Sequence, residues 1–192
     1  VYQLDIECDN EKKIVSRYKK NDVSLKEKKT IIRKINDNIP PENKGQTVIA
    51  GFGPAGIFAA YELAKSGYKP IVIERGLDVE NRKKTVEKFW NTGELDTECN
   101  VSFGEGGAGT FSDGKLNTGT KDTRARKVLE EFVENGATED ILYLAKPHIG
   151  TDKLRPTIKN IRKKIISLGG EVFFETKLTK ILTKDNTVIG AE

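Results

Sequence analysis

Methionine is absent from all 192 residues of the chain, the first position included. The sequence also starts and ends within apparent strands, Val1 to Ile6 and Thr187 to Glu192. Both features lead us to expect a fragment of a larger protein rather than a whole natural chain.

Cysteine is equally scarce, with two residues, Cys8 and Cys99, that form no metal-binding or redox spacing. Such usage is typical of free thiols in a reducing compartment, so we expect a cytoplasmic protein without a metal site. No apolar run approaches the roughly 18–20 residues of a membrane helix. No signal peptide is recognisable either, which favours the same compartment.

The chain also lacks a strong excess of one charge. Lys and Arg number 33 against 29 Asp and Glu, a net charge of +4, and the two signs alternate along the sequence. This pattern is typical of a solvated surface rather than a nucleic-acid platform, so nucleic acid is an unlikely partner. Hydrophobic residues make up 36%, which can supply a core.

The most informative stretch of the sequence is a glycine motif between two apolar runs. An apolar run from Thr47 to Ala50 meets Gly51, Gly53 and Gly56, spaced as G-x-G-x-x-G. A helical pattern follows, and then the apolar run Ile71-Val72-Ile73 ends in Glu74. Strand, glycine turn, helix and strand in this order predict a βαβ unit that binds a dinucleotide.

Each residue of the motif has a physical role in that prediction. Gly51 permits the tight turn, Gly53 leaves the backbone open to a pyrophosphate, and Gly56 lets the helix pack on the sheet. Pro54 suits the first helical turn, where its missing N–H has no helical partner. Glu74 would accept hydrogen bonds from a ribose hydroxyl. The remaining interpretation is a tight turn in a domain without a ligand.

We expect two regions in the chain. Residues 1–44 would be the end of a small N-terminal domain and a linker that contains Pro40 and Pro41, with Gly45 just after it. Residues 45–192 would be an α/β domain with a Rossmann-like parallel sheet, truncated at its C-terminal end. Residues 177–183 and 187–192 read as two strands of a small antiparallel hairpin, joined at Asp185-Asn186.

Two arginines follow the second strand. Arg75 comes directly after Glu74, and Arg82 lies in the first turns of the next predicted helix, which Asp78 caps. Each is either a ligand for cofactor phosphate or ribose, or a surface charge.

A second glycine-rich stretch holds five glycines between Gly104 and Gly114. Apolar residues interrupt it, which favours a loop that brings its backbone close to a flat ring or a phosphate over a flexible linker. Ser112, Asp113 and Lys115 would then present donors and charge to the ligand. The single histidine, His148, lies in a Pro/Gly turn, where a structural role is commoner than acid–base catalysis.

At this point the sequence resembles a known family. The run Val48-Ile-Ala-Gly-Phe-Gly-Pro-Ala-Gly56 with Glu74-Arg75 is similar to the FAD-binding half of glutathione-reductase-like flavoproteins with two dinucleotide-binding domains. Two longer runs, Phe103 to Leu116 and Pro147 to Leu154, resemble the bacterial FAD-dependent, or NAD(FAD)-utilising, dehydrogenases. The resemblance covers about residues 45–192.

The resemblance implies FAD bound in an extended form. The pyrophosphate would contact Gly51, Phe52, Gly53, Pro54, Ala55 and Gly56. Glu74 would hold the adenosine ribose, Leu178 would touch the adenine, and Arg75 or Arg82 would lie near phosphate or ribose. The flavin side would be formed by Gly107, Gly109, Thr110 and Ser112.

The family name implies an FAD-dependent oxidoreductase that acts on a small molecule, with NAD(P)H as a possible electron donor. A fragment without a substrate domain should show no turnover by itself. Two alternatives stay open: a non-catalytic FAD- or NAD-binding module, and an RNA-modifying flavoprotein, for which the basic pI of about 8.9 is the only support.

Overall fold

A computed structural model describes residues 4, 6–18, 23–25, 47–112, 114–116, 122, 124–144 and 146–192. The chain divides into two compact units, Val1–Asn38 and Ile39–Glu192. In the first unit the described residues include one helix, α1 (Glu11–Tyr18), none of whose side chains is buried. The predicted linker, residues 38–45, lies outside the described residues.

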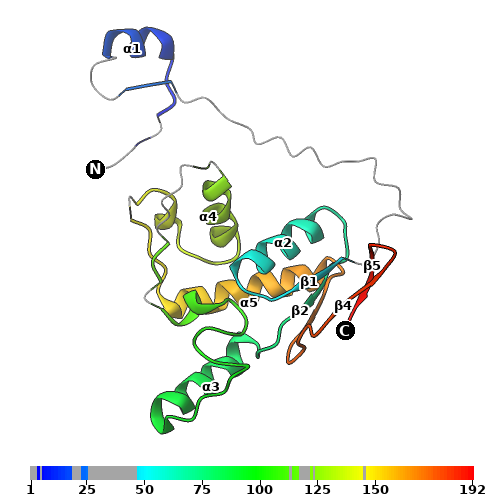
Figure 1. Ribbon diagram of the computed structural model, residues 1–192. Helices are drawn as coiled ribbons and strands as arrows, with labels where there is room; N and C mark the ends of the chain where they lie inside the picture. The colour runs from blue at the N-terminus through cyan, green and yellow to red at the C-terminus, as the bar shows by residue number, and fades with distance from the viewer. Residues whose placement is uncertain are drawn as a thin grey trace. The chain divides into compact units, whose positions relative to one another are not determined.

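The second unit is built on a parallel sheet of three short strands, β1 (Val48–Ala50), β2 (Ile71–Ile73) and β3 (Glu171–Phe173). The spatial order is β1-β2-β3, so β2 is central (Figure 1). Three rows of side chains cross the sheet in register: Val48–Ile71–Glu171, Ile49–Val72–Val172 and Ala50–Ile73–Phe173. Because side chains alternate along a strand, the middle row points to one face and the outer rows to the other.

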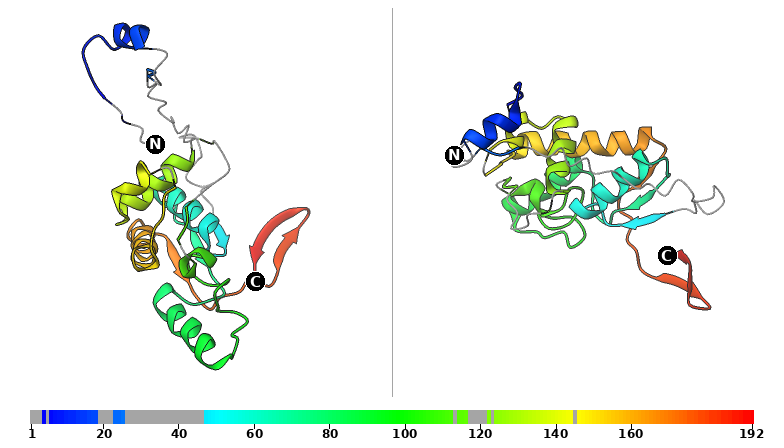
Figure 2. Two further views of the ribbon diagram at one scale, coloured as in Figure 1. Left: turned by 90° about the vertical axis from the view of Figure 1, so that its left-hand side faces the viewer. Right: turned by 90° about the horizontal axis from the view of Figure 1, so that it is seen from above.

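Two helices cover the face of the middle row. Helix α2 (Pro54–Lys65) and helix α5 (Thr151–Ser167) contact each other and the sheet, as Figures 1 and 2 show. Their apolar positions recur at helical spacing, which places one stripe of each helix in the core. The core side chains of the two helices include Ile57, Ala60, Ala64, Leu154, Ile158, Ile161 and Ile165.

Helix α4 (Arg124–Glu134) extends this core beside α2. The rings of Phe58 and Phe132 meet edge to face with centroids 5.4 Å apart. Lys65 forms an ion pair with the buried Glu131 at 2.8 Å. A short 3-10 turn, η3 (Glu139–Leu142), follows α4 and buries Ile141 completely.

Helix α3 (Val79–Thr92) begins as the sequence predicts, with Asp78 as its N-cap. The Asp78 carboxylate accepts hydrogen bonds from the N–H groups of Glu80 and Asn81, which would otherwise lack helical partners. Gly93 ends the helix in the left-handed conformation with φ of 76°. A second 3-10 turn, η2 (Ala108–Phe111), lies in the glycine-rich stretch.

The last two strands, β4 (Ile181–Lys184) and β5 (Thr187–Ala191), form an antiparallel hairpin. Asp185 and Asn186 at its tip both have positive φ, 49° and 59°, which is the backbone of a two-residue hairpin turn. The hairpin projects from the rest of the unit in Figures 1 and 2. The predicted α/β class, the βαβ unit, the parallel sheet and the hairpin are therefore confirmed.

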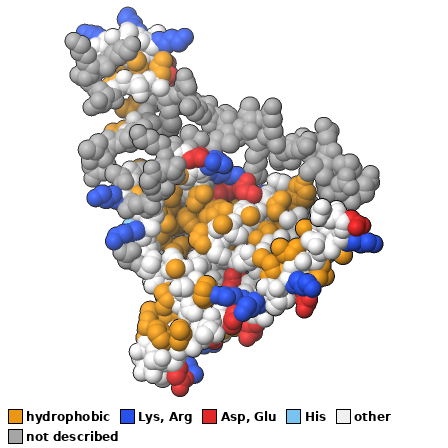
Figure 3. Space-filling view, viewed as in Figure 1, with side chains coloured by type: hydrophobic (Ala, Val, Ile, Leu, Met, Phe, Trp, Pro, Cys, Tyr) orange, Lys and Arg blue, Asp and Glu red, His pale blue; other side chains and the backbone are white. Residues whose placement is uncertain are grey.

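Apolar side chains reach the surface in several groups (Figure 3). The most exposed in the second unit include Trp90, Leu95, Tyr143, Ile166, Ile181, Val188 and Ile189. No helix among the described residues is long and apolar enough to cross a membrane.

Candidate functional site

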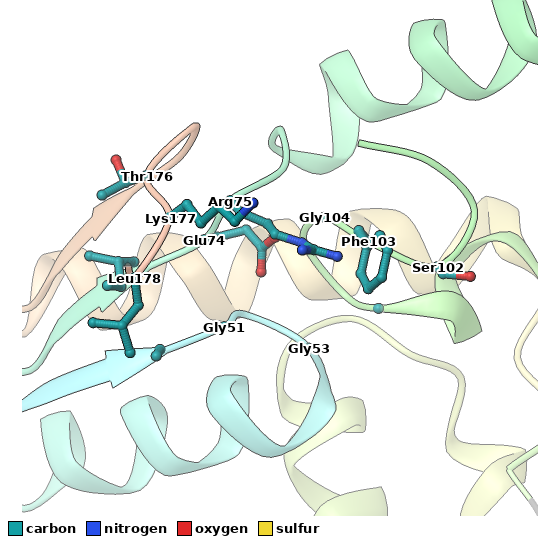
Figure 4. Close-up of a pocket in the computed structure, with 13 residues that line it drawn as sticks. Gly51, Gly53, Glu74, Arg75, Ser102, Phe103, Gly104, Thr176, Lys177 and Leu178 are labelled. Carbon is teal, nitrogen blue, oxygen red and sulfur yellow. The ribbon is translucent and has the colours of Figure 1, made fainter. Parts of the chain in front are cut away.

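A cavity of about 350 Å³ lies at the carboxyl ends of β1 and β2 (Figure 4). Its walls come from the first glycine turn, from the end of β2, from the second glycine-rich loop and from the segment after β3. They consist of Ala50, Gly51, Gly53, Ile73, Glu74, Arg75, Ser102, Phe103, Gly104, Gly107, Thr176, Lys177 and Leu178. Ligands of open parallel sheets bind at this end of the strands.

The three glycines of the first turn differ in what surrounds them. Gly51 has φ of 95°, a conformation that side chains other than glycine rarely adopt. A Cβ on Gly53 would meet no atom within 4 Å, whereas a Cβ on Gly56 would overlap the carbonyl oxygen of Gly51. Gly56 is thus required for packing, whereas the space beside Gly53 is open.

The same turn presents the N-terminus of α2. Pro54 occupies the first helical turn, and Gly53, the N-cap residue, supplies no side-chain hydrogen bond to the helix. The N–H groups of the first turn and the positive end of the helix dipole together favour an anionic group here.

Glu74 is held in a fixed position beside this turn. Its carboxylate accepts a hydrogen bond from the N–H of Phe52 at 2.7 Å and one from the N–H of Gly76 at 2.8 Å. The residue is 5% exposed, yet it lines the cavity, and Figure 4 shows the carboxylate directed toward the first glycine turn. Each oxygen keeps a further lone pair for a ligand hydroxyl.

Charged and aromatic side chains form one rim of the cavity. The Arg75 guanidinium lies 3.5 Å from the centre of the Phe103 ring, and the two are side by side in Figure 4. Glu98 approaches Arg75 at 3.7 Å and Lys177 at 3.0 Å. One carboxylate therefore lies between the two cations of the rim.

The second glycine-rich loop is joined to the first turn. The N–H of Gly106 donates to the carbonyl of Phe52 at 2.9 Å, and a Cβ on Gly107 would lie 2.9 Å from Cδ of Pro54. Gly107 has φ of 65°, so both its conformation and its contact require glycine. The two glycine motifs, which are far apart in the sequence, thus form one structure.

Arg82 holds the start of this loop. It is completely buried, and its guanidinium donates to the carbonyls of Asn100, Val101, Gly104 and Glu105. Burial lowers the pKa of Arg82 to about 10, so the group is still charged at neutral pH. The alternative of a surface charge is wrong for Arg82. Its donors are also committed to backbone carbonyls, and it does not line the cavity.

Glu105 occupies a buried position between three elements. Its carboxylate accepts a hydrogen bond from the N–H of Val79, at the start of α3, and lies 3.1 Å from Nε of Arg162 on α5. Burial raises the pKa of Glu105 to about 7 despite these partners. This carboxyl group was not identified from the sequence.

The structure brings together part of the predicted site. The predicted residues that line the cavity are Gly51, Gly53, Glu74, Arg75, Gly107 and Leu178. Phe52, Pro54, Ala55 and Gly56 belong to the turn and the helix start behind it. Gly109, Thr110 and Ser112 lie outside the cavity wall, and the Thr110 side chain is buried against the loop itself. Asp113 lies outside the described residues.

Several cavity residues were missed. Ser102, Phe103, Thr176 and Lys177 lie in irregular segments where no periodic pattern marks them, and only the folded chain brings them to the strand ends.

Neither His148 nor Cys99 lines the cavity. His148 is exposed and pairs through its backbone with Lys115. Cys99 is buried, and burial raises the pKa of its thiol. The residues that the structure describes contain no group of three or more His, Cys, Asp or Glu that could hold a metal ion.

No family model matches the chain. An uncharacterized protein of Clostridium beijerinckii is 52% identical over 186 residues, which are 96% of this chain and 34% of that protein. The chain therefore spans about a third of the length of this curated relative.

Two solved structures overlap with most of the chain. THI4 of Thermovibrio ammonificans is 21% identical with a TM-score of 0.43, over 73% of this chain and 43% of that one. L-Amino acid deaminase of Proteus myxofaciens, solved with anthranilate, is 14% identical with a TM-score of 0.35, over 76% and 41% of the two chains. Similarity at this level does not assign a function, so the functional proposal for this chain is argued from its own cavity.

Proposed function

We propose that the second unit binds FAD and is the cofactor-binding part of a flavin-dependent oxidoreductase. The observation that supports this best is the space beside Gly53 in the same cavity as the Glu74 carboxylate. A backbone open to a pyrophosphate and an acceptor for ribose hydroxyls are the two features that dinucleotide binding requires at this sheet edge.

In this proposal each half of the nucleotide has its own residues. Gly51, Gly53 and the N-terminus of α2 hold the pyrophosphate, since that end of the helix favours negative charge. Glu74 accepts from the adenosine ribose. Leu178, which Figure 4 shows across the cavity from Phe103, contacts the adenine ring. When bound, the flavin supplies the capacity to accept a hydride or an electron pair from a substrate or a nicotinamide.

Glu74 should also select against a 2′-phosphate. Its carboxylate is fixed by two backbone hydrogen bonds and cannot turn away from the ribose site without breaking them. A phosphate at that position would meet a negative charge at close range. The site is thus suited to FAD or NAD and unsuited to NADP.

The flavin end is assigned to the second glycine-rich loop. Gly104 and Gly107 lie in the cavity wall, and the loop continues from there to Thr110 and Ser112. Replacement of Gly107 by alanine would strain the backbone and press on Pro54, so it should lower FAD affinity through the shape of both loops.

The experiment is a titration of the 192-residue chain with FAD, followed by flavin fluorescence quenching and absorbance. Gly53→Val places a side chain in the open space and should lower FAD affinity at least about tenfold, the effect of 1.4 kcal/mol. Ala59→Val, at an exposed position of the same helix, is the control and should bind as the parent does. Equal affinity of the Gly53 variant and the control would contradict the proposed pyrophosphate site.

Whether the protein is an enzyme or a passive binder is a separate test. A flavoprotein of full length should lose its oxidised-flavin absorbance under anaerobic conditions when NADH or NADPH is added. FAD binding without reduction by either nicotinamide would favour the non-catalytic module.

A further inference from the structure

Arg155 on α5 is a cation without an anionic partner among the described residues. Its Cζ atom lies over the Phe111 ring, 4.6 Å from the ring centre, and its Nε is buried without a hydrogen-bond acceptor. Asp152, one turn earlier on the same helix, forms no ion pair with it in the described part of the chain. Every other described arginine of the second unit has a carboxylate or carbonyl partner: Arg75, Arg82, Arg124, Arg126 and Arg162.

A second cation makes the position of Arg155 less favourable still. Arg82 lies over the same ring, 4.7 Å from the centre of Phe111. Burial is the main cause of the lowered pKa of Arg82, and the neighbouring charge of Arg155 lowers it further. A partly buried charge that has no counterion and repels its neighbour is costly for the folded chain. Arg155 is therefore better explained by a ligand than by a contribution to stability.

The free donors of Arg155 suit an oxyanion. A guanidinium carries its N–H groups in a planar fork that matches two oxygens of a carboxylate or a phosphate. The contact with Phe111 covers one side of the group, and the side chain as a whole is partly exposed, so a ligand can reach it. The ring also restricts the directions in which the fork can point, which reduces the freedom lost on binding.

The position of this group relates it to the proposed flavin end. Phe111 ends η2, which begins directly after Gly107 of the cavity wall and packs against α5. Arg155 therefore lies beside the second glycine-rich loop but not in the cavity wall itself. The pyrophosphate of the nucleotide is assigned to the N-terminus of α2, so an oxyanion at Arg155 belongs to a different molecule.

We propose that Arg155 binds an oxyanion group, a carboxylate or a phosphate, of the small-molecule substrate. The choice of a substrate as the ligand rests on the proposed function, whereas oxyanion binding at Arg155 does not require a flavin. The substrates of this protein are then anionic compounds, and Arg155 orients them beside the loop that forms the flavin end.

The test is a titration of the 192-residue chain, without FAD, with succinate and with inorganic phosphate at constant ionic strength. The melting temperature should rise with the concentration of at least one of the two anions, because a ligand of the folded state stabilises it. Uncharged succinamide should produce no shift. The anion that binds more tightly identifies the substrate group. No shift with either anion would overturn the proposal.

Two variants of equal charge test the residue itself. Arg155→Gln should weaken anion binding at least about tenfold, the effect of 1.4 kcal/mol. Lys153→Gln, at an exposed position two residues earlier, removes the same charge and should bind the anion as the parent does. Equal weakening in both variants would reduce the site to general charge attraction and overturn the proposal. Without ligand, Arg155→Gln should unfold at no lower denaturant concentration than Lys153→Gln, and a lower midpoint would show a structural role instead.

A titration with FAD separates this proposal from the proposed function. Arg155→Gln should bind FAD as the parent does, because Arg155 does not line the cavity. Equal losses of FAD and anion affinity in this variant would identify the anion as a phosphate of the cofactor and overturn the substrate site. A parent chain that binds the anion through Arg155 but does not bind FAD would contradict the proposed function and support the oxyanion site.

Discussion

A methyl group at Gly56 has no room. Its Cβ would overlap the carbonyl oxygen of Gly51, and both partners are backbone atoms that cannot turn away. We expect Gly56→Ala to lower the free energy of unfolding by about 3 kcal/mol, the upper range for forced overpacking. Chemical denaturation measures this loss. Gly53→Ala is the comparison and should cost less than 1 kcal/mol, since its methyl group meets nothing. Equal costs would show that the turn is looser than described.

Glu105 should make stability depend on pH. Its pKa is about 7 in the folded chain and 4.5 as its ordinary value, so between these pH values the folded state binds more protons than the unfolded state. Stability must therefore fall as pH rises through this window, by about 3 kcal/mol in total. The groups that face it are Arg162, Val79 N–H, Glu80 and Asp78.

Replacement by glutamine removes this titration. Glu105→Gln keeps an acceptor for the N–H of Val79, and the slope of unfolding free energy between pH 5 and 7 should become flatter. Glu134→Gln, at a side chain 63% exposed, is the control. An unchanged slope in the Glu105 variant would assign the pH dependence to other groups.

Among the elements, α3 has a role beyond its own packing. Through Arg82 it binds four carbonyls of the loop that leads into the second glycine motif. We expect Arg82→Met to lower the free energy of unfolding by about 3–5 kcal/mol, because several carbonyls lose their donors in a buried setting. Hydrogen exchange should also quicken in residues 100–106. Lys83→Met, on the exposed side of the same helix, should change stability by less than about 0.5 kcal/mol. Normal protection of the loop in the Arg82 variant would contradict this role.

The sequence predicted the helices, strands and turns better than it predicted which polar side chains are buried and what they contact. The glycine spacing, the Asp78 cap and the Asp185-Asn186 turn depend on local backbone chemistry, so they could be recognised before folding. The burial of Arg82 and Glu105 could not be, because each is satisfied by groups 18 or more positions away. The same limit applies to Ser102 and Lys177, which reach the cavity only through the fold.

For the molecule as a whole, ligand binding should appear as stability. A ligand that binds only the folded state adds about 2.7 kcal/mol when its concentration is 100 times the dissociation constant. For a unit of this size that is a rise of roughly 5–10 °C in melting temperature. We expect FAD to produce this shift in the parent chain and in Ala59→Val. In Gly53→Val at the same concentration the shift should be at most about half as large, because a tenfold weaker affinity leaves about 1.4 kcal/mol of stabilisation. A shift of equal size in all three would place the flavin elsewhere.

Glu74 has a consequence for how tightly a ligand can be held. A glutamate on a surface rotates freely and loses that freedom when it binds, a loss of about 0.5–1.5 kcal/mol for a flexible side chain. Here the two backbone N–H groups have already fixed the carboxylate in the folded chain. The entropy of its rotamers is lost on folding and not on binding, so the hydrogen bonds that it forms with a ribose are not offset by that loss.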